Sequence, residues 1–398
     1  MGYPFTLDDV AFLRSPAGGA ALGVAAGLAL TEASRLSDVD TVRRAVGPRN
    51  AAAVLETAVL RRRAASKLDG ADGWLFTGDA LQQASAWPVA AHRASRLAAM
   101  AGLAGLDVHD VTCSVGVDLA ALGAVARRAV GSDMDAVRLA MAAHNLRSSS
   151  VALVRADALR PVSRGTVVFA DPARRDGLGR RRWRSSDFTP SLDDLATVYS
   201  GRPLVVKSAP GMDFASAPWA SEVELVSLDG DVREACLWSA PLATAGVRRR
   251  ATVLSTSGPQ WTITDADADP SDCRVRAPGQ WLVNPDGAVV RAGLVRQYGA
   301  AHGLGQLDER IAYLTGDAPP PGVRAFRILE YGHYSEKELR GVLHRVDGGT
   351  LEILVRGLDV DPNALRPRLR LRGSTAYTVV LTRIGRTPTA FICRPERQ

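Results

Sequence analysis

Four aspartates recur between residues 107 and 171, and each ends or closely follows an apolar segment with strand character. They are Asp110, Asp133, Asp157 and Asp171. Carboxylates accept hydrogen bonds from hydroxyl and amino groups. If the preceding segments are parallel strands, the four carboxylates lie along the edge where such sheets bind ligands. The spacing therefore predicts a nucleoside-binding site.

The segments between these aspartates alternate between strand and helix patterns. We expect strands at 107–112, 130–133, 151–154 and 166–170, and helices at 119–130 and 134–146. Alternating elements of this length form right-handed βαβ crossovers and a parallel sheet. The expected fold class is α/β, with a Rossmann-like core.

The turn after the first strand excludes two common ligands. Residues 113–118 contain a single glycine, Gly116, where a dinucleotide fingerprint needs three, and no Walker lysine follows. A ligand with ribose and adenine but no phosphate fits better, and S-adenosylmethionine is such a ligand. We expect its ribose at Asp133, its adenine amino group at Asp157, and its amino-acid end at the turn and Asp110.

Several segments carry a family resemblance. They are "DVTCSVGVDLAAL", "VGSDMDAVRLAMAAHNL", "RADAL", "VFADPARRDGLGRR", "VVKSAPGMD", the lead-in "LQQASAWPVAAHRASRLA" and, near the end, "RGLDVDPNALRPRLRLRG". On these segments the sequence resembles the class I S-adenosylmethionine-dependent methyltransferases, specifically a bacterial group with a C-terminal THUMP-like domain. The resemblance covers most of the chain. The core is also distantly similar to trimethylguanosine synthases, which methylate a guanine exocyclic amine.

The resemblance implies a set of cofactor-binding residues, and together with the helix, strand and turn patterns along the chain it indicates a domain order. The cofactor residues are Gln83 and Ser85 in the lead-in, then Asp110, Thr112, Cys113, Gly116, Asp118, Asp133, Met134, Asp157, Ala158 and Asp171. The domain order is an N-terminal helical domain (1–100), the methyltransferase core (101–243), a β-rich connecting region (244–321) ending in a proline run, and an α+β THUMP-like domain (322–398).

The fourth strand leads into the expected catalytic loop, Asp171-Pro172-Ala173-Arg174. This loop occupies the place of the D-P-P-Y-type motif of amino-group methyltransferases. A carboxylate and a carbonyl there accept both N–H bonds of an exocyclic amine and so aim its lone pair at the methyl group. Asp171, Pro172 and Arg174 are the catalytic candidates. No aromatic residue follows the proline here, although an arginine can stack on a base.

The same loop resembles the D-P-A-R motif of uracil C5 methyltransferases. Carbon methylation in that group needs a cysteine nucleophile after the fifth strand. Here the fifth strand, 203–207, is followed by Ser208-Ala209-Pro210-Gly211. Because the sequence has no cysteine at that place, we disfavour this mechanism.

Basic residues favour RNA as the substrate. The net charge is +7, and Arg175, Arg180, Arg181 and Arg182 surround Trp183 beside the expected active site, with Lys207 at the same edge. Arginines beside an aromatic residue suit a phosphate backbone and an unstacked base. THUMP domains bind structured RNA, and the resemblance implies the same here. A proteome rich in arginine is the alternative reason for the charge.

Other features narrow the class of protein. Four scattered cysteines without a C-x-x-C pair indicate neither zinc nor disulfides, so no metal is expected. No signal peptide or membrane span is evident, and we expect a cytoplasmic enzyme. The prediction is an S-adenosylmethionine-dependent methyltransferase acting on a base nitrogen in tRNA or rRNA. A protein or small-molecule substrate, or a non-catalytic protein that binds cofactor and RNA, are the alternatives.

Overall fold

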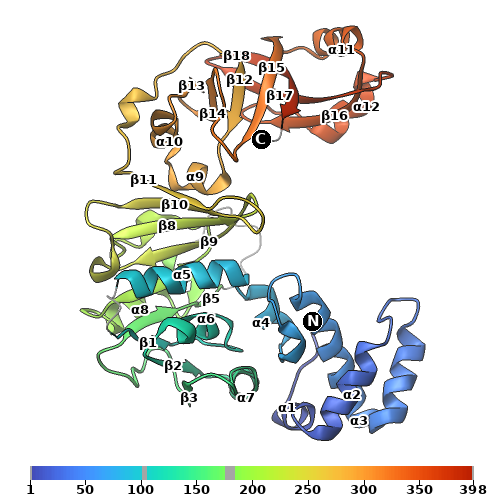
Figure 1. Ribbon diagram of the computed structural model, residues 1–398, viewed down its shortest axis with the longest axis vertical. Coiled ribbons are helices and arrows are strands. Elements are labelled where there is room, and N and C mark those ends of the chain that lie inside the picture. Colours follow the sequence, from blue (N-terminus) through green and yellow to red (C-terminus); the bar gives the residue numbers. More distant parts are fainter. Residues whose placement is uncertain (1, 101–104, 175–183, 397–398) are drawn as a thin grey trace. The chain divides into compact units, whose positions relative to one another are not determined.

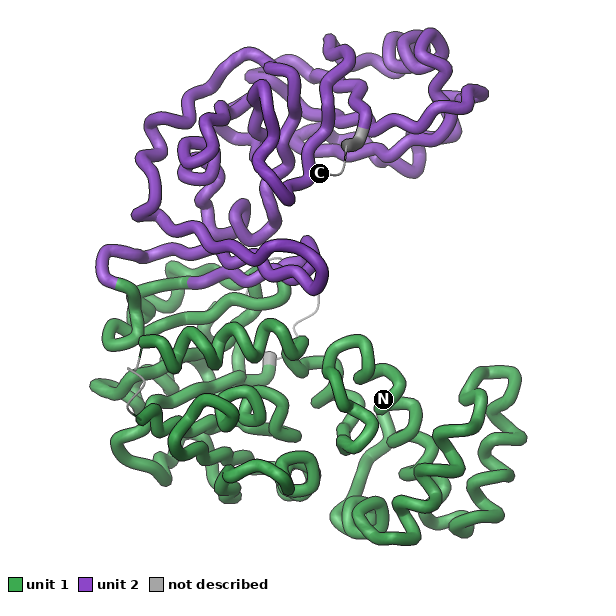
Figure 2. Tube along the Cα trace, viewed as in Figure 1, with its two compact units in different colours: residues 1–223, 233–244 green, residues 224–232, 245–398 purple. Residues whose placement is uncertain are grey.

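The structure, a computed structural model, describes residues 2–100, 105–174 and 184–396. The chain divides into two compact units, drawn in green and purple in Figure 2. Unit 1 comprises Met1–Val223 and Arg233–Thr244, and unit 2 comprises Glu224–Val232 and Ala245–Gln398. Each unit is described by itself below.

The N-terminal part of unit 1 is helical, as the sequence predicts (Figure 1). Its helices are α1 (Leu7–Leu13), α2 (Pro16–Ala26), α3 (Arg35–Ala64), α4 (Gly78–Gln83) and α5 (Trp87–Met100). Thr6 caps α1, because its hydroxyl accepts the Asp9 N–H at 3.2 Å. A kink lies inside α3 just before Pro48, where Gly47 has a φ of 78°.

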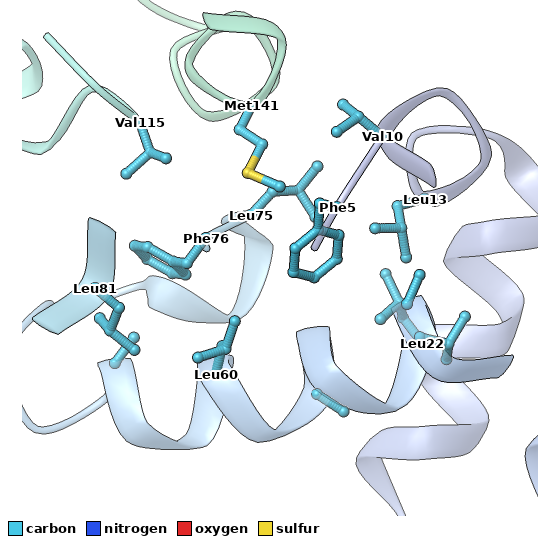
Figure 3. Close-up of a cluster of buried hydrophobic side chains, with 14 of the residues drawn as sticks. Phe5, Val10, Leu13, Leu22, Leu60, Leu75, Phe76, Leu81, Val115 and Met141 are labelled. Carbon is cyan, nitrogen blue, oxygen red and sulfur yellow. The ribbon is translucent and has the colours of Figure 1, made fainter. Parts of the chain in front are cut away.

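A hydrophobic cluster joins these helices to the core of unit 1 (Figure 3). Phe5, Leu60 and Phe76 pack in the same cluster as Met141 of α7 (Ala136–Asn145) and as Val115. Val115 belongs to the turn after the first core strand. Burying these side chains together removes apolar surface from water and holds the N-terminal segment against that turn.

The core of unit 1 is a sheet with the strand order β9-β7-β4-β1-β2-β3. The strands are β1 (Asp107–Asp110), β2 (Arg128–Asp133), β3 (Val151–Arg155), β4 (Val167–Ala170), β7 (Leu204–Ser208) and β9 (Asp231–Trp238), whose first two residues belong to unit 2. The first five are parallel and β9 runs antiparallel to β7. This order confirms the predicted Rossmann-like α/β core.

Successive strand residues alternate between two apolar layers. Val108 and Phe169 pack with α5 and with α6 (Val117–Val125). Val168, which precedes Phe169, and Val206, which follows Val205, pack instead with α8 (Leu192–Val198). Helices therefore cover both faces, which is why these strands read as continuous apolar runs.

One predicted boundary in the core is wrong. The helix expected over 119–130 ends at Val125, and β2 begins at Arg128. Arg127 and Arg128 both bind the carboxylate of Asp107 at the start of β1, with Arg127 Nη2 2.9 Å from Asp107 Oδ2. No glycine or proline marks the turn, so only the pairing of the two strands reveals where the helix stops.

Unit 2 holds three further strands and a second sheet. The three strands have the order β11-β10-β8, with the bounds β8 (Glu222–Leu228, its first two residues in unit 1), β10 (Arg249–Leu254) and β11 (Trp261–Thr264). The second sheet has the order β13-β14-β12-β15-β18-β17-β16. Its strands are β12 (Trp281–Asn284), β13 (Gly305–Asp308), β14 (Ile311–Gly316), β15 (Arg324–His333), β16 (Gly348–Val355), β17 (Thr375–Ile384) and β18 (Thr387–Glu396).

Four helices accompany the second sheet. They are α9 (Gly287–Ala292), α10 (Val295–Ala301), α11 (Glu336–Arg345) and α12 (Pro362–Leu369). From β15 onward, the elements follow the order strand, helix, strand, helix and two strands, which is the α+β class predicted for this domain. Ser335 caps α11 by accepting the Glu338 N–H at 3.2 Å. The proline run at 319–321 connects β14 to β15, which belong to the same sheet.

Candidate functional site

A pocket of about 210 Å³ lies where the strands β1, β2 and β3 end, at the sheet edge where parallel α/β proteins bind ligands. Most residues predicted to bind the cofactor line this pocket. They are Gln83, Thr112, Cys113, Asp118, Asp133, Met134, Asp157, Ala158 and Asp171. The parallel register explains this convergence, because residues far apart in the sequence follow neighbouring strand ends.

Three predicted cofactor residues lie outside the lining. Ser85 is buried and accepts a bond from Arg93 Nη2 at 3.2 Å. Asp110 is buried below the turn and accepts the Thr112 N–H at 3.1 Å. Gly116 precedes α6 with a φ of 94°, where a side chain would be strained. All three residues therefore adjoin or contact residues near the pocket without lining it themselves.

The wall at β2 and β3 combines carboxylates with small apolar groups. Asp133 Oδ2 accepts the Ser114 N–H at 2.9 Å, and Oδ1 accepts the Asp135 N–H at 2.8 Å. Asp157 accepts the Leu159 N–H at 2.9 Å. Ala156 and Ala158 stand beside these acids. Acceptors for hydroxyl and amino groups next to apolar surface match the chemistry of an adenosine ligand.

Asn145 holds the cofactor turn in place, and nothing in the sequence pointed to it. Its Nδ2 donates to the carbonyls of Leu75 and Val115, both at 2.9 Å, and its Oδ1 accepts the Leu75 N–H at 2.7 Å. The side chain is buried. One amide thereby joins the segment before α4 to the turn after β1.

The candidate catalytic loop leaves β4 and returns as a small hairpin. The N–H of Asp171 donates to Thr112 Oγ1 at 2.6 Å, which ties the loop to the cofactor turn. Pro172 is buried. Arg174 pairs with Phe188 where β5 (Ala173–Arg174) meets β6 (Phe188–Thr189). Asp171 and Ala173 face the pocket, together with Thr189 and Pro190.

A buried set of charges lies behind the pocket. Arg93, from α5, binds Asp118 Oδ1 at 2.6 Å and Glu234 Oε1 at 2.7 Å. Burial lowers the pKa of Arg93, but the two carboxylates outweigh it and raise the pKa well above its usual value. For Asp118, burial raises the pKa, and Arg93 and Lys207 lower it below its usual value.

Asp110 and Asp171 hold protons more tightly than ordinary carboxylates. Burial, followed by the charge of Asp118, raises the pKa of Asp110 well above its usual value. Burial also raises the pKa of Asp171, against the opposing effect of Lys207. Lys207 Nζ lies 2.6 Å from Asp171 Oδ2 and 3.9 Å from Asp118 Oδ2.

Cys113 is in the pocket wall but is a poor nucleophile. Burial, together with Asp110 and Asp133, raises the pKa of its thiol far above its usual value. A thiol that stays protonated does not attack a pyrimidine ring, so this position offers no support for C5 methylation.

The basic loop predicted to meet RNA is only partly described. Arg175, Arg180, Arg181, Arg182 and Trp183 lie outside the described residues. Lys207, predicted at the same surface, has an ammonium in contact with Asp171, and 11% of its side chain is exposed.

Several lining residues escaped the sequence reasoning. They are Ala80, Ala84, Val111, Ser114, Val115, Val117, Arg138, Ala156, Ala173, Thr189 and Pro190. Ser114 adjoins the predicted Cys113, and Arg138 lies one helical turn beyond the predicted Met134, so spacing alone could have suggested both. Thr189 and Pro190 reach the pocket because β6 pairs with β5, which no local pattern signals.

Comparison with known proteins places the chain in a family. Residues 323–395 match the model of the THUMP domain-like family, and residues 6–64 match that of a domain of unknown function. Two Mycobacterium tuberculosis proteins, from strains CDC 1551/Oshkosh and H37Rv, are each 55% identical over 359 residues, which cover 86% of this chain and 97% of theirs. Both are named uncharacterized S-adenosylmethionine-dependent methyltransferases.

A solved structure shares the fold over the full length. The crystal structure of a proposed methyltransferase from Porphyromonas gingivalis W83 has a TM-score of 0.74 and 18% identity, and it covers 100% of both chains. The fold and the pocket define a class I methyltransferase with a C-terminal THUMP-like domain. The chain belongs to the S-adenosylmethionine-dependent methyltransferase family of the two mycobacterial proteins, and S-adenosylmethionine is its cofactor.

Among the described residues, no group of three or more His, Cys, Asp or Glu side chains is placed to hold a metal ion. No helix in the described ranges combines the length and apolar character needed to cross a bilayer.

Proposed function

We propose that this enzyme transfers the methyl group of S-adenosylmethionine to a base nitrogen of RNA, either tRNA or rRNA, in the cytoplasm. The observation that carries the RNA part is a cavity of about 560 Å³ in the THUMP-like domain, lined by Arg340, Arg370 and Arg372 with His344 and one acid, Asp347. Arg340 is also paired with Glu336 at 3.2 Å. The arginines outnumber the acid in the lining, and this excess of positive charge favours a phosphate-bearing ligand.

The proposed cofactor site uses the pocket of unit 1. The carboxylate of Asp133 accepts hydrogen bonds from the ribose hydroxyls, and the carboxylate of Asp157 accepts one from the adenine amino group. The turn from Thr112 to Gly116 faces the amino-acid end. The cofactor supplies an electrophilic methyl group on a sulfonium, and the chain's own residues bind, orient and exclude water around it.

The proposed acceptor site lies at Asp171 and Ala173. An exocyclic or ring nitrogen is oriented by hydrogen bonds from its N–H groups to the Asp171 carboxylate and a loop carbonyl. Pro172 stiffens the loop between them. Arg174 and the arginines at 175 and 180–182, with Trp183, hold the RNA beside the loop. A base within a duplex is flipped out to reach this place.

We propose the same four-part division that the sequence predicts. Residues 1–100 cover the cofactor side, 101–243 form the catalytic core, 244–321 connect, and 322–398 bind RNA. The family match over 323–395 supports the last boundary.

The test is methyl transfer from labelled S-adenosylmethionine to total RNA of a strain lacking this protein. Wild type and Asp171→Ala are compared, with Asp135→Ala as the matched control, because Asp135 caps α7 without lining the pocket. We expect label in RNA with wild type and Asp135→Ala only, and nucleoside analysis then names the atom. Absence of label with intact cofactor binding contradicts the proposal and favours a protein or small-molecule acceptor, or a non-catalytic binder.

A further inference from the structure

Lys207 sits where three parts of the active site meet. It comes from the end of β7, and its Nζ lies 2.6 Å from Asp171 Oδ2. The same Nζ donates to the carbonyl of Gln83 at 3.2 Å and lies 3.9 Å from Asp118 Oδ2. An ammonium has three N–H donors, and these contacts direct it into the protein.

Gln83 is the last residue of α4, the short helix that contributes Ala80 and Gln83 to the pocket wall. The carbonyls at this helix end carry partial negative charge, which a cation stabilises. A second lysine, Lys67, holds the same end by donating to the carbonyls of Leu81 at 3.0 Å and Gln82 at 3.1 Å. No contact described for Lys67 reaches Asp171, so it is a natural comparison for Lys207.

We propose that Lys207 is a positioning residue that ties the end of α4, on the cofactor side, to the Asp171 carboxylate, on the acceptor side. The Lys207 bond uses one oxygen of Asp171 and so fixes the plane of the carboxylate. Lys207 then holds both α4 and the Asp171 carboxylate, so that the cofactor and the acceptor are bound in a defined relative geometry.

The charges around Asp171 give Lys207 a second effect. Asp171 faces two cations, Lys207 of β7 and Arg93 of α5, and two acids, Asp118 of α6 and Asp110 of β1. Lys207 opposes the effect of burial and of Asp118 on the pKa of Asp171. Without this ammonium, Asp171 takes up a proton at a higher pH and accepts hydrogen bonds less often.

The decisive experiment measures cofactor binding and needs no acceptor. S-adenosylmethionine is titrated calorimetrically into wild type, Lys207→Met, Lys207→Arg and Lys67→Met near pH 7, in two buffers with different ionisation enthalpies. The cofactor carries a net positive charge, so its binding favours the ionised form of any nearby carboxyl group that is still protonated at the pH of the titration. We expect about tenfold weaker binding and proton release for Lys207→Met.

The other variants separate positioning from general damage. Lys67→Met should weaken binding without proton release, and Lys207→Arg should recover most of the affinity. In Asp171→Asn/Lys207→Met the proton release should fall to the level of Asp171→Asn alone, because Asp110, whose pKa is also raised, is then the remaining neighbouring carboxyl. Equal proton linkage in Lys207→Met and Lys67→Met overturns the proposal, as does proton release in the double variant that exceeds that of Asp171→Asn. Circular dichroism confirms that each variant is folded, and if Lys207→Met is not, Lys207→Gln takes its place.

A second arm rests on the proposed RNA function. Single-turnover methylation of the RNA pool should slow at least about tenfold in Lys207→Met, and the acidic limb of its pH profile should move to higher pH. Lys67→Met should keep the wild-type profile. If wild type itself labels no RNA, the RNA proposal fails, while the binding arm still decides the role of Lys207.

Discussion

Arg93 and Glu234 lie 141 residues apart in the chain and form a two-point ion pair inside the protein. Arg93 Nη2 lies 2.7 Å from Glu234 Oε1 and 2.8 Å from Oε2, and Nε lies 3.1 Å from Oε1. Both side chains are at least 98% buried. The pair joins the lead-in helix α5 to the strand β9 directly behind the cofactor pocket.

Loss of this pair should destabilise unit 1. Arg93→Met leaves Glu234 as a buried charge without its paired cation and Asp118 with Lys207 3.9 Å away, which costs about 3–5 kcal/mol of unfolding free energy. Urea denaturation followed by tryptophan fluorescence measures the change. Arg49→Met is the control, since its pair with Asp8 is 80% exposed on both sides and should be worth about 0–1 kcal/mol. Equal midpoints for the two variants would contradict this prediction.

Asp133 should determine cofactor affinity. Asp133→Ala removes a charged acceptor from the pocket and frees the two N–H groups that it holds, so binding should weaken about 10- to 100-fold. Calorimetric titration with S-adenosylmethionine measures the loss. Asp135→Ala, two residues away, removes the cap of α7 and a half-exposed ion pair with Arg138 at 3.7 Å, and it should lower stability by about 1 kcal/mol with affinity intact. Unchanged affinity in Asp133→Ala would remove this carboxylate from the site.

Gly116 should tolerate no side chain. Its φ of 94° is costly for other residues, and an added Cβ would lie 2.8 Å from Leu146 Cδ1. We expect Gly116→Ala to cost about 1–2 kcal/mol for the backbone and a further 1–3 kcal/mol, roughly, for the clash. Gly165→Ala is the control, because Gly165 has a φ of 65° with open space around it. Thermal unfolding compares the two, and equal losses would show that the Leu146 contact is harmless.

His109 should make unit 1 less stable in mild acid. Burial, followed by the charge of Arg202, lowers the pKa of His109 to about 4. The unfolded chain, with a histidine pKa of about 6.5, therefore binds the proton more tightly. The contribution of neutral His109 to the free energy of unfolding is fully present above about pH 6.5 and is lost as the pH falls toward about 4. Urea midpoints across this window should fall more steeply for wild type than for His109→Gln, and parallel slopes would refute the assignment.

The arginine-lined cavity should control the salt dependence of RNA binding. Each of Arg370→Gln and Arg372→Gln should reduce the slope of log affinity against log salt by about 1. Filter binding to total RNA at several salt concentrations measures the slope. Arg324→Gln is the control, since Arg324 of β15 is paired with Glu352 of β16 and does not line the cavity. Slopes unchanged in the first two variants would move the RNA surface elsewhere.

The sequence predicted the core because its signals are local. Apolar runs ending at Asp133 and near Asp157 mark strand ends, and parallel strands bring those ends to one edge whatever the rest of the chain does. The same reasoning misplaced the end of α6, since an alanine-rich run contains no helix stop at Val125. It also placed Ser85 in the pocket, whereas only Gln83 faces it.

Local signals in the sequence predict the class of protein and the sheet edge that binds the cofactor, because periodicity and strand-end residues follow from neighbours along the chain. Tertiary structure alone decided which charges meet. Arg93 reaches Glu234, and Lys207 reaches both Gln83 and Asp171, across many intervening residues. Such contacts depend on how helices and strands pack, and a side chain's burial and pKa follow from that packing rather than from its position in the sequence.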